Sequence, residues 1–312
     1  MNKYLKKIIG TPFIQIPLNA SKKIALPGFD GMPIYNVIWF FIQGIQKSSL
    51  TTRASSLAFR FFLALFPSII FLFALIPYIP IENFHTELLD LIKSVLPDNA
   101  YELSISTIDE LISDKNDSLL SFGFLFALYL ASDGVNSMIS AFNESYHITE
   151  KGSFIETRLR SLFVLFLLTS LMIIAIGLTV FSSTFTNYLI SHDFISSSFW
   201  VYALTIFKFI IILLLFFLGI SSIYYFGSAK TNKFRFISAG STLATLLSIL
   251  LSVGFAYYVN NFSNYNKIYG SIGTLMVIML WLYFNSLVLL IGFELNASIL
   301  HAKFNTQKNL KQ

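Results

Sequence analysis

The sequence predicts an all-α polytopic membrane protein with six transmembrane helices in one bundle, and three observations support this prediction. Of the 312 residues, 55% are hydrophobic and only 12% are charged, which gives too little polar surface for a water-soluble fold. Six apolar stretches are each long enough to cross a bilayer, which takes about 20 residues. Basic residues gather in the segments at one end of these stretches, and acidic residues gather at the other. Together these features exclude a soluble globular domain.

The segment before the first apolar stretch is predicted to stay on one membrane surface. Residues 1–33 form a basic tail whose short apolar run is interrupted by Gln15 and two prolines, with no cleavage site after it. Residues 34–52 begin with IYNVIWFFIQGIQ, which is apolar but about 13 residues long and therefore too short to span. We expect residues 34–52 to form a juxtamembrane helix in the cytosolic interface.

The transmembrane domain is predicted to occupy residues 53–300. Its spans are expected at 55–79, 119–141, 159–181, 200–226, 236–259 and 271–300. Pro67 lies within the first span, where it removes a backbone hydrogen bond and is expected to bend the helix.

Small residues recur at every fourth position of the fifth span. They are Gly240, Ala244, Ser248, Ser252 and Ala256. Small side chains let two helix backbones approach closely in lipid, where no hydrophobic force drives helices together. We interpret the row as a packing seam, and a sliding interface is the alternative.

The charges of the connecting segments predict the orientation. Lysine and arginine, which are retained on the cytosolic side, precede the first span, follow the second and fourth, and recur in the C-terminal tail 301–312. Both termini are therefore expected in the cytosol. Residues 81–118, between the first two spans, are instead rich in Asp and Glu. Apolar residues recur there at helical spacing, so we predict two short amphipathic helices on the outer face, forming either a solvated cap or a gate or partner site.

Four ionisable residues lie inside the predicted spans: Arg60, Asp133, Lys208 and Glu294. A charge near the bilayer centre costs about 3 kcal/mol on insertion scales, so each is expected to have a partner. Counted along the helices, Lys208 lies in the outer half and the other three lie in the cytosolic half. Asn143 and Asn296 add polar groups near that depth. Either Arg60 pairs with Asp133 or Glu294 to join helices, or these residues line a polar pathway in which Arg60 anchors an anionic headgroup or solute.

The sequence contains no recognisable catalytic or metal-binding motif. The four histidines are dispersed, and the absence of cysteine excludes a thiolate nucleophile and Cys-ligated metals. Neither a P-loop nor a dinucleotide fingerprint is present. We therefore expect no enzyme activity, no cofactor and no metal, and any transport must follow a gradient. The net charge of +5 is explained by topology rather than by a nucleic-acid partner.

Three stretches, at 53–77, 131–162 and 269–299, resemble the YihY/BrkB family of bacterial inner-membrane proteins. The matching residues are Arg53, Ala54, Ala58, Phe66, Pro67, Phe142, Asn143, Tyr146, Trp281, Tyr283, Gly292, Glu294, Leu295 and Asn296. The last six form the most specific motif. Where this chain has Arg60, the family commonly has an uncharged aromatic residue. The resemblance implies six spans, cytosolic termini and residence in the inner membrane, and the family once carried the label ribonuclease BN.

These features leave three functional hypotheses. The leading one is a translocator, not driven by ATP, of an amphipathic or anionic molecule such as a lipid, which agrees with family-level proposals of envelope lipid transport. The second is an envelope scaffold that binds other proteins through its acidic outer helices and basic tails. The third is a membrane-associated ribonuclease. Membrane lipids are the expected partners, and the oligomeric state is not specified by the sequence.

Overall fold

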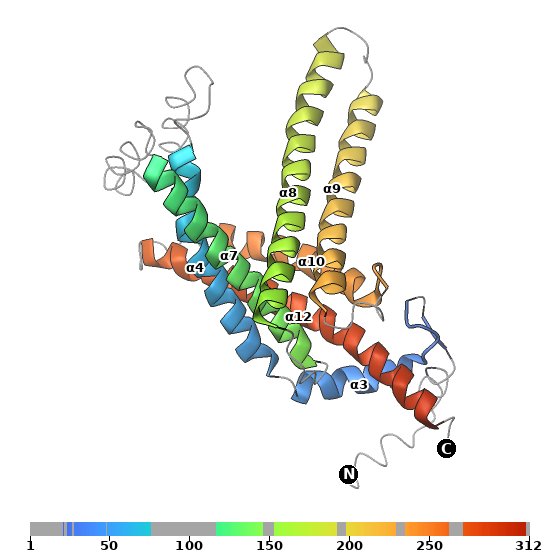
Figure 1. The fold of residues 1–312 in the computed structure, drawn as a ribbon. Coiled ribbons are helices and arrows are strands. Elements are labelled where there is room, and N and C mark those ends of the chain that lie inside the picture. Colours follow the sequence, from blue (N-terminus) through green and yellow to red (C-terminus); the bar gives the residue numbers. More distant parts are fainter. Residues whose placement is uncertain are drawn as a thin grey trace. The chain divides into compact units, whose positions relative to one another are not determined.

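The computed structural model describes residues 21, 24–26, 28–47, 49–75, 117–145, 153–191, 198–228, 235–261 and 271–309. These residues form seven α-helices (Figure 1): α3 (Ile34–Lys47), α4 (Leu50–Leu75), α7 (Asp117–Ser145), α8 (Phe154–Ser191), α9 (Ser198–Gly227), α10 (Ala239–Asn261) and α12 (Ser271–Asn309). The two amphipathic helices that we predict within 81–118 lie outside the described residues.

Six of the described helices are long and apolar enough to cross a membrane, which confirms the predicted fold class. Their candidate spans are Leu50–Phe71, Asp117–Glu144, Phe154–Thr179, Tyr202–Gly227, Ala239–Val259 and Leu275–Asn305. Within the segment 34–52, which we predict as a juxtamembrane helix, α3 ends at Lys47 and α4 begins at Leu50 as a separate helix. At the other end, α12 continues to Asn309 and so includes most of the segment that we predicted as a tail after residue 300. The continuation is stabilised because Ala302 is buried beside Ile299.

The chain divides into two compact units. The first comprises Met1–Arg53, Met138–Ser252 and Leu287–Gln312, and the second comprises Ala54–Ser137 and Val253–Ser286. Each unit is described by itself below.

In the first unit, α8 and α9 lie side by side as a helical hairpin (Figure 1). The ring centroids of Phe163 and Phe226 are 5.1 Å apart, and a Cβ at Gly219 would meet Leu168 at an ordinary 3.7 Å. Over an apolar stretch of 18 residues in each of these two spans, only 6% of the residues are buried. Most side chains of these stretches therefore point away from the protein, as expected for helices that face lipid.

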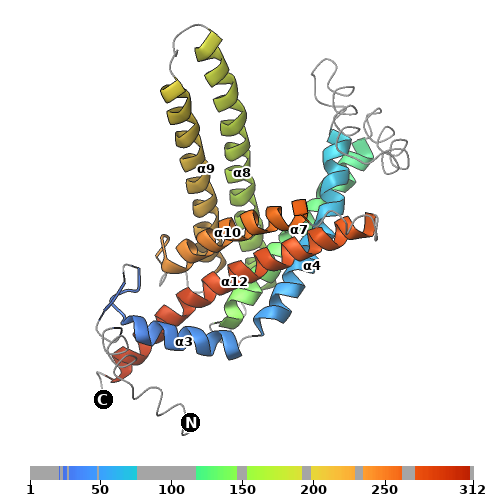
Figure 2. The same ribbon diagram turned by 180° about the vertical axis from the view of Figure 1, so that it is seen from behind.

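The core of the first unit combines a group of stacked aromatic side chains with a close contact between two helices at Gly240 and Gly292. Phe142 stacks on Phe293 with centroids 4.2 Å apart, and the Tyr224 hydroxyl donates a 2.7 Å hydrogen bond to the Leu289 carbonyl. Beside them the first part of α10 crosses α12 (Figure 2). A Cβ on Gly292 would lie 2.7 Å from both the Ala244 Cβ and the Gly240 carbonyl oxygen. Glycine is thus required at this crossing, because no side chain fits between the backbones.

The row of small residues on α10 contributes to this crossing over part of its length. Gly240, Ala244 and Ser248 are buried, whereas Ser252 and Ala256 are exposed. The Gly292 partner on α12 was not anticipated in our interpretation of the row.

The amphipathic helix α3 packs on the C-terminal part of α12 (Figures 1 and 2). Its Val37 joins a buried cluster with Phe29, Ile299 and Ala302. Its opposite face leaves Trp39 and Ile42 exposed. One face of α3 therefore binds the protein, and the other is free to enter a membrane interface.

In the second unit, α4 packs closely on α7. A Cβ at Gly123 would lie 3.5 Å from the backbone of Phe71, and a Cβ at Gly134 would lie 3.0 Å from the Phe61 ring. Pro67 lies inside α4, which continues on both sides of it. These two glycines allow the close approach of α7 to α4.

Candidate functional site

A buried ion pair joins α4 to α12 in the first unit. Arg53 Nη2 lies 3.9 Å from Glu294 Oε2, and the two side chains are only 7% and 4% exposed. Arg53 Nη1 also donates a hydrogen bond to the Ala141 carbonyl oxygen on α7, and Arg53 Nε lies 3.7 Å from Glu144 Oε2. One guanidinium thus connects three helices, and its charge is balanced by one buried and one exposed carboxylate.

The backbone of α3 lies directly on the Glu294 carboxylate. A Cβ at Gly44 would be 2.8 Å from Glu294 Cδ, and closer still to Oε1. Real Cβ atoms essentially never approach so closely. Gly44 therefore allows α3 to seal the ion pair from solvent, and any side chain at this position would displace either the helix or the carboxylate.

Arg53 was not among the residues that we predicted for this site. We assigned it to the basic residues before the first span, but α4 begins at Leu50, so Arg53 belongs to the membrane-spanning helix. The sequence did contain a signal, because Glu294 in an apolar helix needs a cation, and Arg53 belongs to the family-like motif of the first span.

A second ion pair, between Arg60 and Asp133, joins α4 to α7 in the second unit. Both residues lie near the middle of their candidate spans, Leu50–Phe71 and Asp117–Glu144. Their side chains are 43% and 27% exposed, so this pair is far more accessible than the pair between Arg53 and Glu294. Of the two partners that we considered for Arg60, the structure places Asp133 beside it, whereas Glu294 contacts Arg53.

The Asn296 side chain forms two hydrogen bonds at the start of α10. Its Oδ1 accepts a 2.8 Å hydrogen bond from the Gly240 amide, and its Nδ2 donates a 2.9 Å hydrogen bond to Ser238 Oγ. Amides in the first turn of a helix have no partner within that helix. The buried Asn296 side chain therefore caps α10 from α12, which is a structural role.

Two predicted site residues, Lys208 and Asn143, remain to be placed. The Lys208 ammonium lies 5.6 Å from the centroid of the neighbouring Phe209 ring, and no ion pair connects it to another described residue. Asn143 is partly buried on α7, next to the stacked Phe142. Among the described residues, no three His, Cys, Asp or Glu side chains are grouped to hold a metal ion.

Comparisons with known proteins agree with this architecture. The family profile described as "Virulence factor BrkB" matches residues 41–312. The chain is 32% identical over 257 residues to YfkH of Bacillus subtilis (strain 168), a protein named as ribonuclease-like, and the match covers 81% of this chain and 90% of YfkH. It is 24% identical over 273 residues to a UPF0761 membrane protein of Aggregatibacter aphrophilus (strain NJ8700), covering 87% of this chain and 95% of that protein.

A similar match, 24% identity over 260 residues, links the chain to a UPF0761 membrane protein of Haemophilus influenzae (strain 86-028NP), covering 83% of this chain and 93% of that protein. No solved structure matches the chain. The family profile covers both ion pairs and all six candidate spans. The chain is therefore a multi-pass integral membrane protein of the BrkB/YihY family.

Proposed function

We propose that this protein translocates an amphipathic or anionic molecule, such as a phospholipid, down its gradient and without ATP. The observation that carries the proposal is the accessible ion pair of Arg60 and Asp133 near the middle of two membrane-spanning helices. Residence in the bacterial cytoplasmic membrane with both termini in the cytosol is part of the proposal, as is the absence of enzyme activity.

The accessibility of Arg60 is the first argument. An arginine side chain that is 43% exposed at this depth would contact hydrocarbon unless water or a polar group reached it. A charge in hydrocarbon costs several kcal/mol, whereas a polar track along α4 and α7 removes that cost. An accessible charge in mid-span therefore supports a pathway, while the buried pair of Arg53 and Glu294 is better suited to hold helices together.

The chemistry of the pair is the second argument. A guanidinium binds carboxylate and phosphate oxygens with similar geometry, so an anionic headgroup can replace Asp133 as the partner of Arg60. Asp133 would neutralise Arg60 whenever no substrate is present. This exchange of partners lets an anion pass without leaving an uncompensated charge in the membrane.

Lipid transfer in reconstituted vesicles tests the proposal. Purified protein is reconstituted with a trace of phospholipid that carries a fluorescent headgroup, and the fraction reduced by external dithionite measures transfer between leaflets. Wild-type vesicles are expected to expose nearly all of the dye, and the Arg60→Lys variant is expected to retain more activity than Arg60→Gln. A matched control is Arg160→Gln, which removes a partly buried arginine that pairs with the exposed Glu156 at 3.0 Å near the start of α8.

Wild-type vesicles that exchange neither lipids nor small organic anions would contradict the proposal. In that case the scaffold hypothesis would become the better one, and a protein partner should be sought. Because YfkH is named as ribonuclease-like, the same preparation should be incubated with RNA. We expect no cleavage above that of empty vesicles.

A further inference from the structure

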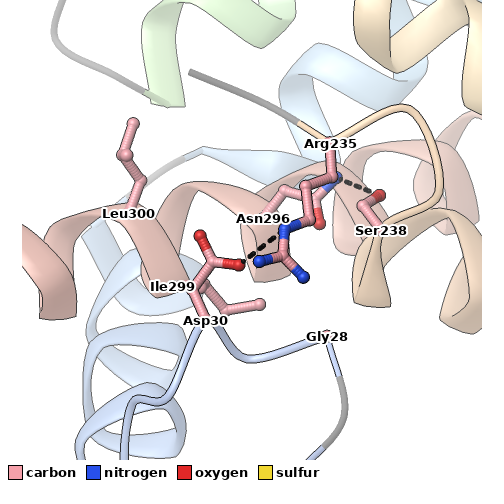
Figure 3. Close-up of a pocket in the computed structure, with 7 residues that line it drawn as sticks. All are labelled: Gly28, Asp30, Arg235, Ser238, Asn296, Ile299 and Leu300. Atoms are coloured by element: carbon pink, nitrogen blue, oxygen red, sulfur yellow. Dashed lines mark hydrogen bonds and ion pairs between the residues drawn. The ribbon is translucent and has the colours of Figure 1, made fainter.

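A short loop before α3 places one carboxylate between two cations from distant parts of the chain. Asp30 Oδ1 lies 3.1 Å from Arg235 Nε, and Asp30 Oδ2 lies 3.2 Å from Lys303 Nζ. Arg235, whose ion pair with Asp30 is drawn in Figure 3, precedes α10, and Lys303 lies in the C-terminal part of α12. All three residues belong to the first unit.

The loop holds the Asp30 carboxylate firmly in this position. Asp30 has a left-handed backbone (φ 52°) and stands between Gly28 (φ 89°) and Gly31 (φ 77°). Phe29 is buried in the cluster of α3 and α12, and a Cβ at Gly28 would lie 3.5 Å from the Ala239 Cβ. Aspartate adopts a left-handed backbone more readily than most residues, and the two left-handed glycines and the buried Phe29 fix the path of the loop around it.

The cations remain accessible although Asp30 occupies the space between them. The Arg235 and Lys303 side chains are 70% and 41% exposed, whereas Asp30 is only 20% exposed. A cavity of about 30 Å³ lies beside the carboxylate and is also lined by Ser238 and Asn296 (Figure 3). It has room for one water-sized group, such as a phosphate oxygen.

The position of the cations along the helices indicates where their ligand comes from. Arg235 lies just before the candidate span Ala239–Val259, and Lys303 lies near the end of the candidate span Leu275–Asn305. Both cations are therefore at the level of a membrane surface, where the phosphates of lipid headgroups lie. Basic residues between helix ends at this level are typical of sites for anionic lipids.

We infer that Arg235 and Lys303 form a binding site for the phosphate of an anionic lipid headgroup, and that Asp30 is a built-in competitor for this site. The carboxylate supplies the same charge and two of the same oxygen contacts that a phosphate would supply. Binding of the headgroup exchanges the ion pairs of Asp30 for ion pairs with phosphate. The site does not depend on the proposed translocation, because it uses none of the residues of the pair in mid-span.

Lipid retention by variants of the full chain tests the inference. Wild-type protein, Asp30→Asn, Arg235→Gln and Lys303→Gln are purified in detergent with equal amounts of phosphatidylglycerol and phosphatidylcholine, and native mass spectrometry measures the lipid retained. Asp30→Asn removes the competing charge and keeps the shape of the side chain. We expect it to raise the apparent affinity for phosphatidylglycerol roughly two- to fivefold, the range that an exposed ion pair contributes to an equilibrium constant. Retention of phosphatidylcholine should not change.

The two variants that remove a cation should lower phosphatidylglycerol retention, whereas Asp30→Asn should raise it. They keep the inference testable even if Asp30→Asn fails to fold. Arg235→Gln changes a largely exposed side chain and should lower phosphatidylglycerol retention two- to fivefold, as should Lys303→Gln. Glu156→Gln and Arg160→Gln, which remove the exposed pair of α8, are the matched controls and should have no effect. Equal phosphatidylglycerol retention in wild-type protein and Arg235→Gln would overturn the inference, as would an unchanged or lower affinity in folded Asp30→Asn.

Inorganic phosphate distinguishes a lipid site from a site for free phosphate. Titration of lipid-depleted protein with millimolar phosphate, followed by thermal unfolding, should raise Tm no more than an equal concentration of chloride does. A rise that is specific to phosphate and is lost in Arg235→Gln would assign the site to the free anion and would refute the lipid as its ligand.

Discussion

At the scale of single residues, two arginines of α4 form ion pairs in different environments. Arg53 is enclosed by α7, α12 and the backbone of α3, whereas Arg60 has an accessible carboxylate as its partner. Removing one member of a buried pair leaves an uncompensated charge, which costs about 3 to 5 kcal/mol in soluble proteins. The cost is lower where water reaches the remaining charge.

This difference predicts how charge removal affects folding yield. Arg60→Ala strands Asp133, which is 27% exposed, so the yield of folded protein should fall moderately. The double change Arg60→Ala/Asp133→Asn should restore part of the yield, because no unpaired charge remains. Arg53→Ala strands the fully enclosed Glu294 and should reduce the yield more than Arg60→Ala does. Fluorescence-detected size exclusion of tagged protein measures all three variants.

Additive losses in the Arg60 and Asp133 double variant would show that the pair has no stabilising role. Arg160→Ala is the control for a pair at a helix start, because Glu156 is 60% exposed and is not left in a low-dielectric site. Its yield should equal that of wild-type protein.

Gly44 allows a test of the seal over Glu294. Gly44→Ala places a methyl group against the carboxylate, and overpacking of this kind costs about 1 to 3 kcal/mol. Its Tm in detergent should therefore fall. The matched control is Gly177→Ala on α8, where a Cβ would meet nothing within 4 Å. The control should keep the wild-type Tm, and an equal loss in both variants would show that the contact with Glu294 is unimportant.

At the scale of elements, the crossing of α10 and α12 depends on glycine on both helices and on a cap supplied by Asn296. Close approach allows many weak contacts between backbones, which is how helices associate in lipid. The row of small residues on α10 predicted such a crossing. Its partner could not be identified from sequence, because Gly292 is one of two widely spaced glycines in the long apolar helix α12 and no periodic pattern of small residues accompanies it.

Gly292→Ala is expected to separate these two helices. The new methyl group would lie 2.7 Å from the Ala244 Cβ, and neither backbone can move without breaking the cap on α10. The variant should lose thermal stability by about 1 to 3 kcal/mol, measured as a lower Tm. Gly219→Ala is the control, because its Cβ would meet only leucine side chains at 3.7 and 4.0 Å. Equal stability of both variants would contradict a close crossing.

At the scale of the whole molecule, the six candidate spans of the described helices lead us to expect the segments before the first span and after the last span on the same side of the membrane. Because the chain contains no cysteine, single cysteines can be introduced without removing others. Ser153→Cys precedes α8 and is expected in the cytosol, whereas Ser191→Cys ends α8 and is expected outside. A membrane-impermeant maleimide should label Ser191→Cys in intact spheroplasts and Ser153→Cys only after permeabilisation. The reverse pattern would invert the predicted topology.

The sequence predicted the number of spans because hydropathy and helix length are local properties of the chain. Arg60, Asp133, Lys208 and Glu294 were also identified from sequence, since a charge in an apolar run is conspicuous, whereas Arg53 at the start of the first span was missed. The ion-pair partners of these charges were harder to predict from sequence. The pairing of Glu294 with Arg53 depends on how α4 and α12 pack, and Asp30 lies in a loop that has no helical pattern. Long-range packing therefore determined the parts of the site that the sequence left open.

The ion pair of Arg53 and Glu294 also has a consequence for biogenesis. Arg53 leaves the ribosome with the first membrane-spanning helix, and Glu144 follows with the second, but Glu294 is made only with the last described helix. While the residues between Glu144 and Glu294 are being made, only the exposed Glu144 is present to pair with Arg53. A nascent chain that stops before α12 lacks Glu294 and the helix that encloses Arg53. Arg53 is therefore enclosed only once the last described helix has been made.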